Sequence, residues 1–368
     1  PEEPLSNGVV DELEEINIHS IGPKKDLAKL ETSKSFTRNL LEKYKIKASP
    51  KFKVFEELEG ISEFINEIEI VIKPDGLTGG KGVLVQGEHF NTKDKALDYC
   101  KSILKLHSRV IIEEKLEGEE FSLQSFTDGK DLFDCPPVQD HKRVFEGDTG
   151  PNTGGMGSYS CNDHLLPFLT KYDIESAHDI TTKVLSALSK ETNSFYKGVM
   201  YGGFMLTKDG VRLLEYNARL GDPEAMNVLS IFDGDFVELC YSIIEGRLRY
   251  FHSRFRNLST VCKYVVPNGY PDTPIKNQKI EIGEIPKNAR LFYAGVETKP
   301  DGMYMTGSRA VAVLGVANEL DNAEQIAEKG VSVVKGDVFH RRDIGTRKLI
   351  EKRVKHMEMV RRLKKKDI

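Results

Sequence analysis

Apolar and polar positions recur along the chain with two different periods, and these periods predict a mixture of strands and helices. Six segments show the short apolar runs or the two-residue alternation of strands, namely 67–72, 82–86, 110–114, 121–127, 201–207 and 211–217. Helices are predicted over 33–44, with Ser33 as N-cap, over 171–189 and from Pro223. Residues 139–159 are rich in Gly, Asp, Asn and Thr and lack a period, which predicts a long functional loop. We therefore expect an α+β fold.

The two ends of the chain differ in charge. Residues 1–20 hold six acidic residues and no Lys or Arg, whereas residues 341–368 hold twelve Lys or Arg against four acidic residues. In that basic segment apolar residues recur at helical spacing, namely Ile350, Val354, Met357, Val360 and Leu363. This spacing predicts a solvated helix packed along one stripe. Because no aromatic residues interleave its charges, we do not expect it to bind nucleic acid.

Composition excludes several classes of protein. The 368 residues are 39% hydrophobic and 30% charged, with a formal net charge of −4, so nothing in the overall charge attracts nucleic acid or a membrane surface. No apolar stretch approaches the roughly 20 residues of a membrane span. The five cysteines are widely spaced without a CxxC pair, which argues against disulfides and structural zinc and favours the cytoplasm. Because the chain starts at Pro1 rather than Met, we expect it to be a processed or truncated product.

A glycine-rich segment between two predicted strands is the first candidate site. In VIKPDGLTGGKGVLV, Gly76, Gly79, Gly80 and Gly82 surround Lys81. Glycines allow the backbone to present successive N–H groups to an anion, and a lysine adds a mobile charge. The spacing departs from the Walker A pattern, and its strand–loop–strand order predicts a hairpin lid over a nucleotide. A mobile hairpin turn without a ligand is the alternative.

Two further lysines and a hinge strengthen the nucleotide hypothesis. Lys73 ends the strand before the glycine loop, and Lys34 stands in the first turn of its helix. A cation at that end opposes the helix dipole by about 0.3–1 kcal/mol, a penalty that a bound phosphate reverses. The segment IIEEKLEGEEFS predicts a strand, a polar hinge and a second strand, which can offer backbone groups to adenine and a carboxylate to ribose.

The segment VRLLEYNARLGDPEAMNVLS suggests a metal site. Residues two apart share one face of a strand, so Glu215 and Asn217 point the same way, and their oxygens suit Mg²⁺. Arg219 continues that face, and its guanidinium can bind a carboxylate or a phosphate through two parallel hydrogen bonds. Asp222 and Pro223 are predicted as N-cap and first residue of the next helix. An exposed polar strand face is the alternative.

Five motifs occur in the order found in one enzyme family. They are GPKKDLAKLETSKSFTRNLLEKY, VIKPDGLTGGKGVLV, QDHKRVFEGDTGPNTGGMGSYS, LLEYNARLGDPEAMNVLS and FHRRDIGTRKLI. Over nearly its whole length the chain resembles the glycinamide ribonucleotide synthetase family of ATP-grasp ligases, and EAMNVLS and TGSRAVAVLG resemble its archaeal branch.

The resemblance implies an ATP-grasp fold, in which two α+β lobes clamp ATP. It also implies four segments: a remnant of a Rossmann-like N-terminal domain at 1–29, the ATP-grasp domain at 30–257 with a lid lobe near 53–118, a small α+β domain at 258–346 and a basic helix at 347–368. The implied reaction joins glycine to 5-phosphoribosylamine through glycyl phosphate, releasing ADP and phosphate, in purine biosynthesis. Glycine and 5-phosphoribosylamine are the expected partners, and the protein is expected to be a monomer or homodimer.

The resemblance also assigns roles to residues. ATP would be held by Lys34, Lys73, Gly79, Gly80, Lys81, Gly82, Glu113, Glu114, Leu116 and Glu120, with Glu120 at the ribose. The implied Mg²⁺ (or Mn²⁺) ligands are Glu215 and Asn217. Substrate binding would fall to Asp140, Lys142, Asn152, Thr153, Gly154, Gly155 and Arg219, and catalysis to Arg219, Lys81 and Asp222. Related enzymes can place a metal ligand where this chain has Gly203, which has no side chain to offer.

These assignments lead to one expectation and two alternatives. Lys81→Ala should lower turnover with a modest loss of folded stability, which activity and melting measurements would check. The chain could instead be an ATP-grasp ligase for another carboxylate, or an ATP-binding chain that is inactive without the rest of the N-terminal domain.

Overall fold

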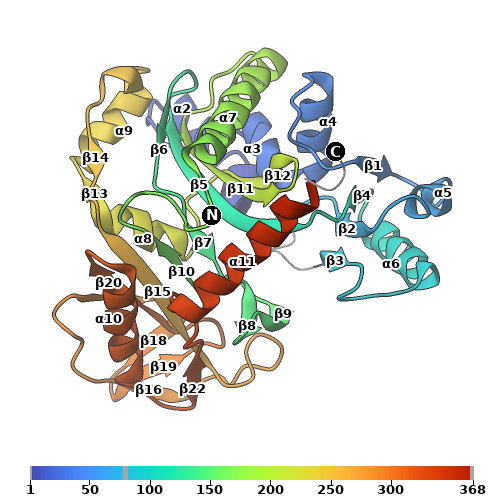
Figure 1. The fold of residues 1–368 in the computed structure, drawn as a ribbon. Helices are drawn as coiled ribbons and strands as arrows, with labels where there is room; N and C mark the ends of the chain where they lie inside the picture. The colour runs from blue at the N-terminus through green and yellow to red at the C-terminus, as the bar shows by residue number, and fades with distance from the viewer. Residues whose placement is uncertain (1, 78–81, 365–368) are drawn as a thin grey trace.

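The computed structural model describes residues 2–77 and 82–364, arranged as two α+β lobes and a third, C-terminal part (Figure 1). The small lobe lies at the right of Figure 1 and has one antiparallel sheet of order β1-β4-β2-β3. Its elements are β1 (Phe52–Phe55), α5 (Ile61–Ile65), β2 (Ile70–Pro74), β3 (Leu84–Val85), α6 (Lys93–Leu106) and β4 (Val110–Glu114). A separate apolar core holds this lobe together.

The predicted hairpin is present, because β2 and β3 pair antiparallel around the glycine segment. Gly79, Gly80 and Lys81 lie outside the described residues. Gly82 adopts a φ of 83°, a left-handed conformation that glycine adopts without strain.

The central lobe is built on a second antiparallel sheet, of order β12-β11-β5-β6. Its strands are β5 (Gly118–Thr127), β6 (Leu132–Asp134), β11 (Gly198–Thr207) and β12 (Gly210–Asn217). The helices around it are α1 (Glu2–Ser6), α2 (Val9–Glu15), α3 (Lys25–Thr32), α4 (Lys34–Lys43), α7 (Lys171–Thr192), α8 (Glu224–Ile231) and α9 (Phe236–Ile244). Ser33 caps α4 as predicted, accepting a hydrogen bond from Phe36 N at 3.2 Å.

The third part contains a sheet of order β17-β20-β15-β10-β7, to which β22 adds beside β15, and a second sheet of order β18-β19-β16-β21. Its strands are β7 (Gln139–Asp140), β10 (Gly157–Ser160), β15 (Ser259–Pro267), β16 (Lys279–Ile282), β17 (Ala289–Tyr293), β18 (Val296–Lys299), β19 (Gly302–Met305), β20 (Val311–Ala317), β21 (Val334–Lys335) and β22 (Val338–His340). The remaining elements are β8 (Arg143–Phe145), β9 (Thr149–Asn152), β13 (Phe232–Asp233), η1 (Leu248–Tyr250), β14 (Arg254–Phe255) and α10 (Leu320–Ser332).

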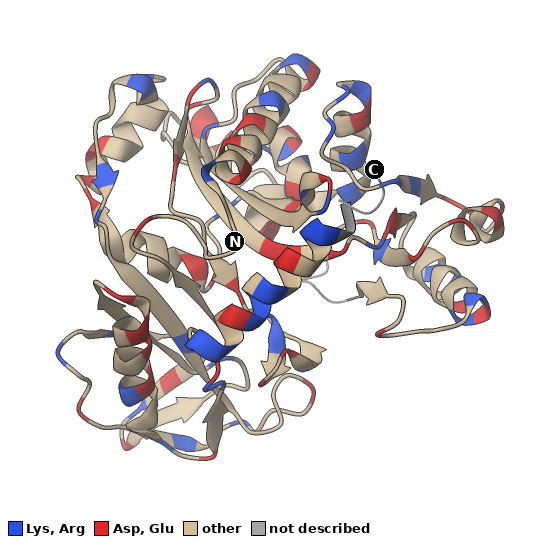
Figure 2. Cartoon of the chain, viewed as in Figure 1, with Lys and Arg blue, Asp and Glu red and all other residues tan. Residues whose placement is uncertain are grey.

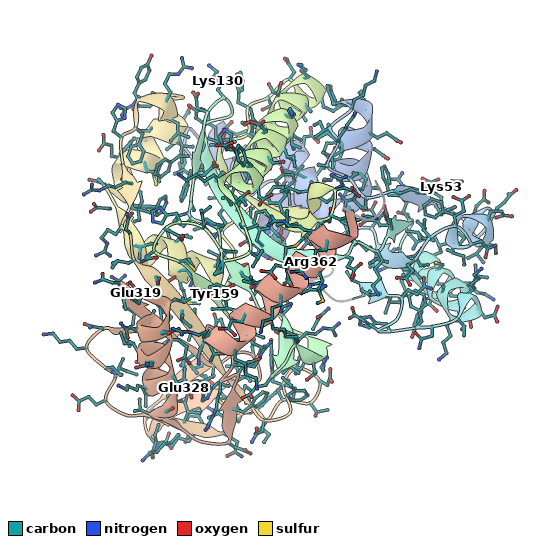
Figure 3. The ribbon with its side chains drawn as sticks, in the orientation of Figure 1. Lys53, Lys130, Tyr159, Glu319, Glu328 and Arg362 are labelled. Carbon is teal, nitrogen blue, oxygen red and sulfur yellow. The ribbon has the colours of Figure 1, made fainter. Side chains whose placement is uncertain are left out.

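The prediction that 139–159 form one irregular loop is wrong. The segment contains β7, β8, β9 and most of β10, whose two to four residues are too few to show a period. Because β10 pairs with β15, this sheet continues across residue 258, and the domain boundary placed there stays a prediction. Tyr159 of β10, labelled in Figure 3, is fully buried and donates to Gln139 Oε1 at 2.8 Å.

The basic C-terminal helix α11 (Arg347–Lys364) runs across the central sheet and contacts β5 (Figure 1). Its apolar stripe is buried at Ile350, Met357 and Val360, as the spacing predicted. Its charged face, visible in Figure 2, is only partly solvated, because His356 Nδ1 lies 2.7 Å from Glu119 Oε1 and Arg353 Nη1 lies 3.2 Å from Glu119 Oε2. The helix therefore also attaches to the central sheet through the Arg353–Glu119 ion pair and the His356–Glu119 hydrogen bond. None of the described helices is long and apolar enough to cross a bilayer.

Candidate functional site

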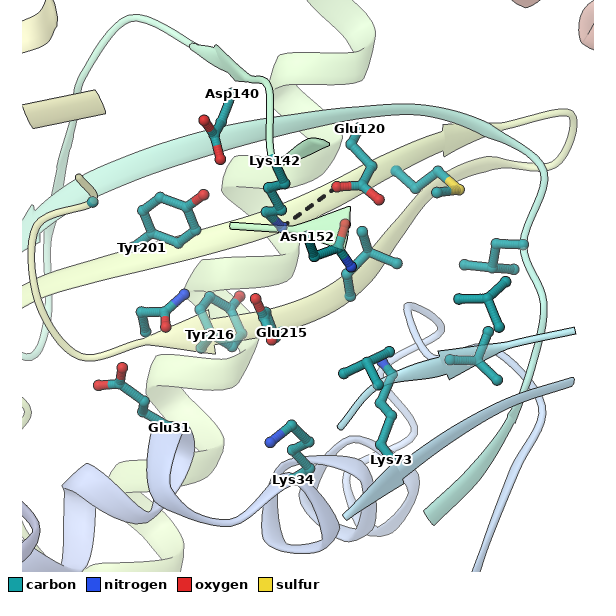
Figure 4. Close-up of a pocket in the computed structure, with 18 of the residues that line it drawn as sticks. Glu31, Lys34, Lys73, Glu120, Asp140, Lys142, Asn152, Tyr201, Glu215 and Tyr216 are labelled. Atoms are coloured by element: carbon teal, nitrogen blue, oxygen red, sulfur yellow. Dashed lines mark ion pairs between the residues drawn. The ribbon is translucent and has the colours of Figure 1, made fainter. Parts of the chain in front are cut away.

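A cleft of about 790 Å³ opens between the two lobes, and most of the predicted site residues line it (Figure 4). These are Lys34, Lys73, Glu113, Glu114, Leu116, Glu120, Asp140, Lys142, Asn152, Thr153, Gly154, Glu215, Asn217, Arg219 and Asp222. Two predicted residues, Gly82 and Gly155, flank the cleft without lining it. Segments far apart in the sequence thus converge on one cavity.

Glu215 and Asn217 both face the cleft from the end of β12, as predicted. Three lysines from distant parts of the chain, Lys34, Lys73 and Lys142, surround the carboxylate of Glu215 (Figure 4). Burial alone would raise the pKa of Glu215, but the charges of Lys142, Lys73 and Lys34 lower it below its usual value. The carboxylate is therefore ionised at neutral pH.

This donor set fits a divalent cation that also binds phosphate. One carboxylate and one amide oxygen are hard ligands, and Mg²⁺ completes such a pair with phosphate oxygens and water. Gly203 lies directly opposite Glu215 in the ladder and adds no ligand. No three His, Cys, Asp or Glu side chains converge on a metal position in the part of the chain that the structure describes. These residues would therefore hold the ion together with a nucleotide rather than in an all-protein cage.

The positive charges opposite this strand are held at defined positions. Lys34 Nζ donates to Gly76 O at 2.8 Å, and burial lowers the pKa of this lysine. The pKa of Lys142 is raised, mainly by Glu120, whose Oε2 lies 3.5 Å from Lys142 Nζ. At the N-terminus of α4, the Asp75 carboxylate accepts from Ser35 N at 3.2 Å, so an anion already occupies that end of the helix dipole.

Glu113 is the most strongly paired carboxylate of the cleft. Its Oε2 accepts from Lys73 Nζ at 2.7 Å, and both its oxygens accept from the Arg38 guanidinium. Burial acts to raise the pKa of Glu113, but Arg38 and Lys73 lower it to about 2. Because these partners engage its side chain, Glu113 itself can offer an adenine ring only backbone groups, and Leu116 of the same hinge between β4 and β5 adds an apolar side chain to the cleft.

A buried acidic pair lies at the other end of the cleft. Glu224 Oε1 accepts from Tyr201 OH at 2.7 Å, while Asp140 Oδ1 has no hydrogen-bond partner in the structure. Burial and the charge of Glu224 raise the pKa of Asp140 well above its usual value, and burial raises that of Glu224 as well. This end of the cleft is thus suited to a ligand that carries a hydrogen-bond donor or a positive charge.

The prediction that Asp222 caps the following helix is wrong. Helix α8 begins at Glu224, Pro223 stands at its N-cap and no side chain caps it. Asp222 instead accepts from Tyr264 OH at 2.7 Å and from Arg309 Nη2 at 2.8 Å. The Asp222 carboxylate is engaged instead by Arg309, from the segment between β19 and β20, in an ion pair that is also a charge-assisted hydrogen bond.

Arg219 lines the cleft, but its guanidinium is already engaged. Its Nε donates to Glu2 Oε1 at 2.6 Å and lies 3.7 Å from Glu31 Oε1. Glu31 also accepts from Ala218 N at 2.9 Å. Two nitrogens of the guanidinium, Nε and Nη2, contact Glu2 Oε1 of α1, and the predicted binding of a substrate carboxylate or phosphate by Arg219 stays a prediction.

Several residues of the site had no role in the sequence analysis. Arg38 stands one helical turn after Lys34, which puts both on one face of α4 and is a signal that the sequence contained. Arg309 belongs to the TGSRAVAVLG motif, but neither its spacing nor its neighbours predict contact with residues 154–155. Glu31, Tyr201 and Glu224 likewise enter the site only through the fold.

Two family profiles match the chain in agreement with this geometry. The profile described as phosphoribosylglycinamide synthetase, ATP-grasp (A) domain, matches residues 32–225, and the corresponding C domain matches residues 260–347. The chain belongs to the phosphoribosylglycinamide synthetase family. The family predicted from the motifs is thereby confirmed.

Individual members of the phosphoribosylglycinamide synthetase family are similar over almost the whole chain. A phosphoribosylamine–glycine ligase of Methanocaldococcus jannaschii is 50% identical over 374 residues, which cover 98% of this chain and 84% of that protein. A Pyrococcus furiosus protein of the same name is 46% identical over 366 residues, covering 98% and 82%. Both relatives come from archaea, as the EAMNVLS and TGSRAVAVLG segments predicted.

Solved structures confirm the α+β ATP-grasp fold. A phosphoribosylamine–glycine ligase from Thermotoga maritima superimposes with a TM-score of 0.78 at 31% identity, over 88% of this chain and 81% of that chain. A biotin carboxylase from Campylobacter jejuni has a TM-score of 0.70 at 13% identity, over 96% of this chain and 76% of that one. The second likeness shows a shared fold alone.

Proposed function

We propose that this ligase uses ATP to join glycine to 5-phosphoribosylamine, forming glycinamide ribonucleotide, ADP and phosphate in purine biosynthesis. The observation that carries the proposal is the placement of Glu215 and Asn217 among Lys34, Lys73 and Lys142 in one cleft. An ionised carboxylate and an amide beside three cations suit a metal-bound polyphosphate.

ATP is placed with its adenine at the hinge and its phosphates at the lysines. The hinge offers the backbone of Glu113 and Glu114 and the side chain of Leu116, and the Glu120 carboxylate stands beside it for ribose hydroxyls. Lys34, Lys73 and the segment from Gly79 to Gly82 with Lys81 are assigned to the phosphates. Glu215 and Asn217 are assigned to Mg²⁺ or Mn²⁺, which when bound neutralises charge on the transferring phosphoryl group.

We assign glycine to the part of the cleft between the acidic pair, Arg219 and the lysines that we assign to the phosphates. The groups assigned to it and to the transferred phosphoryl group are Asp140, Lys142, Asn152, Thr153, Gly154, Gly155, Arg219 and Asp222. The unpartnered oxygen of Asp140 supports the placement of an ammonium group there. Arg219 is assigned to a carboxylate or phosphoryl group that replaces Glu2 in its fork.

The chemistry proceeds in two transfers. A glycine carboxylate oxygen attacks the γ-phosphorus of ATP, and the bond to ADP breaks to leave glycyl phosphate. The amine nitrogen of phosphoribosylamine then attacks the carbonyl carbon, the carbon–oxygen bond to phosphate breaks, and the nitrogen loses a proton. The protein contributes mainly alignment and positive charge, from Lys81, Lys142 and Arg219. The lid lobe shields the acyl phosphate from water.

The protein is assigned to the cytoplasm, with glycine and 5-phosphoribosylamine as small-molecule partners and no nucleic acid or membrane. We assign it as a monomer or homodimer. Within the chain, 1–29 are assigned to the phosphoribosylamine side, 30–257 to ATP, with 53–118 as lid, 258–346 to the C-terminal domain and 347–368 to the basic helix.

An ADP-release assay tests the proposal. We expect release that requires Mg²⁺, glycine and phosphoribosylamine together, and a product mass equal to that of glycinamide ribonucleotide. Turnover with another carboxylate and no response to glycine would instead identify a different carboxylate–amine ligase. Nucleotide binding without turnover under all conditions would identify an ATP-binding chain that needs a further segment.

A further inference from the structure

Arg38 of helix α4 is buried at the junction of the two lobes, with 2% of its surface exposed. Four hydrogen bonds engage its guanidinium. Nε and Nη2 donate to the two carboxylate oxygens of Glu113 at 2.6 and 3.0 Å, and Nη1 and Nη2 donate to the carbonyl oxygens of Leu213 and Leu214 at 2.9 and 2.8 Å. One side chain thus joins β4 of the small lobe to β12 of the central lobe.

The two carbonyl groups mark a β-bulge in β12. Gly203 of β11 lies opposite Glu215 and Phe204 lies opposite Leu213, so Leu214 is an extra residue without a partner. Before the bulge Val211 and Leu213 are buried, and after it the buried residue is Tyr216 rather than residue 215. An extra residue reverses the alternation of faces. Without it, Glu215 and Asn217 would share the core face of Leu213 and would not reach the cleft.

Through Glu113, the Arg38 guanidinium also influences the position of a lysine in the small lobe. Glu113, bound in the Arg38 fork, also accepts from Lys73 Nζ at 2.7 Å. Figure 4 shows Lys73 directed from its strand toward the part of the cleft that holds Glu215. The carboxylate that orients Lys73 is therefore itself oriented by Arg38.

We propose that Arg38 is a positioning residue that sets both halves of the nucleotide site: Glu215 and Asn217 through the bulge carbonyls, and Lys73 through Glu113. The inference rests on the proposed roles of Glu215 and Asn217 in metal binding and of Lys73 in phosphate binding. Only a planar fork can make these four bonds, because a lysine is a point charge on a flexible stem.

Equilibrium binding to Arg38→Lys tests the proposal without relying on turnover. Mn²⁺ binding at saturating ADP, followed by the electron paramagnetic resonance of the free ion, reports on Glu215 and Asn217. Calorimetric ADP binding in EDTA reports on Lys73. We expect both dissociation constants to rise about tenfold, the loss typical of an orienting partner. Glu113→Gln should weaken ADP binding in EDTA and leave the Mn²⁺ constant at saturating ADP within about twofold of the wild type, because the bulge contacts remain.

Arg341→Lys is the matched control. Arg341 is equally buried, binds both Asp343 oxygens at 2.9 and 2.7 Å and donates to Arg143 O at 3.0 Å and to Asp148 Oδ1 at 3.1 Å. Arg143 and Asp148 line the cleft, but neither is assigned to the nucleotide or to the metal. Arg341→Lys should lower the melting temperature and change neither binding constant. Equal losses in both arginine variants would mean a structural role and would overturn the inference.

Glu215→Gln separates the two levels of the proposal. If it leaves Mn²⁺ binding unchanged, the proposed metal site fails, whatever Arg38 does. If it weakens Mn²⁺ binding while Arg38→Lys does not, only the inference about Arg38 is overturned. Should Arg38→Lys not fold, Glu113→Gln decides, and unchanged ADP binding in that variant would refute the coupling to Lys73.

Discussion

Arg309 Nη2 lies 2.8 Å from Asp222 Oδ2, which ties the segment between β19 and β20 to the turn that follows β12. Arg309 Nη1 also donates to Gly154 O at 2.7 Å and to Gly155 O at 3.1 Å, and the guanidinium stacks 4.4 Å from the centre of the Tyr264 ring. One arginine of the C-terminal part therefore holds two segments that we assign to glycine.

Replacing this fork should affect glycine and spare the nucleotide. In Arg309→Lys the charge remains, but a lysine cannot bind Asp222 and both carbonyl groups at once. We expect the KM for glycine to rise by roughly tenfold or more, because small misplacements at a reacting centre are costly. ADP affinity should stay within twofold. An unchanged KM for glycine in steady-state assays would contradict the positioning role of Arg309.

A methyl group at Gly155 should disturb the same segment by steric conflict. With φ at 107°, a Cβ there would lie 2.6 Å from Pro223 Cδ and 2.7 Å from Asp140 Oδ1. We expect Gly155→Ala to lower kcat/KM for glycine by about 100-fold and to lower the melting temperature.

Gly147→Ala is the control for backbone strain. Gly147 also has a positive φ, of 71°, but a Cβ there meets no heavy atom within 4 Å. It should cost about 1 kcal/mol of stability and leave the glycine parameters unchanged. Similar kinetic losses in both variants would show that strain, rather than the contact with Asp140, matters.

Removing the charge of Glu215 should weaken the metal-dependent step. Glu215→Gln keeps the size of the side chain but removes the anion that three lysines surround. We expect turnover to fall by more than about 100-fold and the Mg²⁺ concentration for half-maximal activity to rise. Glu281→Gln, an exposed carboxylate on β16 away from the cleft, is the matched control. Full activity of Glu215→Gln at ordinary Mg²⁺ would refute the metal assignment.

The ionisation of Glu113 should make the stability of the folded chain depend on pH. Its pKa is lowered from 4.5 to about 2 in the folded chain, where the charges of Arg38 and Lys73 outweigh burial. A carboxyl with a depressed pKa stabilises the fold above its unfolded pKa, and this contribution is lost as the pH falls from about 4.5 to about 2. The difference in melting temperature between wild type and Glu113→Gln should therefore be largest near neutral pH and shrink through that window. A difference that stays constant between pH 6 and pH 2.5 would contradict this assignment.

Local signals in the sequence were enough for the strands that border the cleft, for helices α4 and α7, and for the Glu215–Asn217 pair. The Ser33 cap, the β2–β3 hairpin and the shared face of Glu215 and Asn217 follow from capping, turn chemistry and strand alternation, which act over a few residues. Residues 139–159 were misjudged because strands of two to four residues carry no period. Asp222 was misjudged because its partner, Arg309, lies 87 residues away.

What the sequence alone determined was the kind of chemistry: lysines beside a glycine hairpin, an acid and an amide on one strand, and motifs that place the chain in its family. The tertiary structure decided which face of β12 reaches the cleft, because one unpaired residue, Leu214, reverses the alternation and its carbonyl is held by an arginine from another element. It also decided the ionisation of the site, since the pKa of Glu215 depends on lysines that only folding brings near it. Long-range hydrogen bonds and charge interactions act through space, and chain order does not encode them.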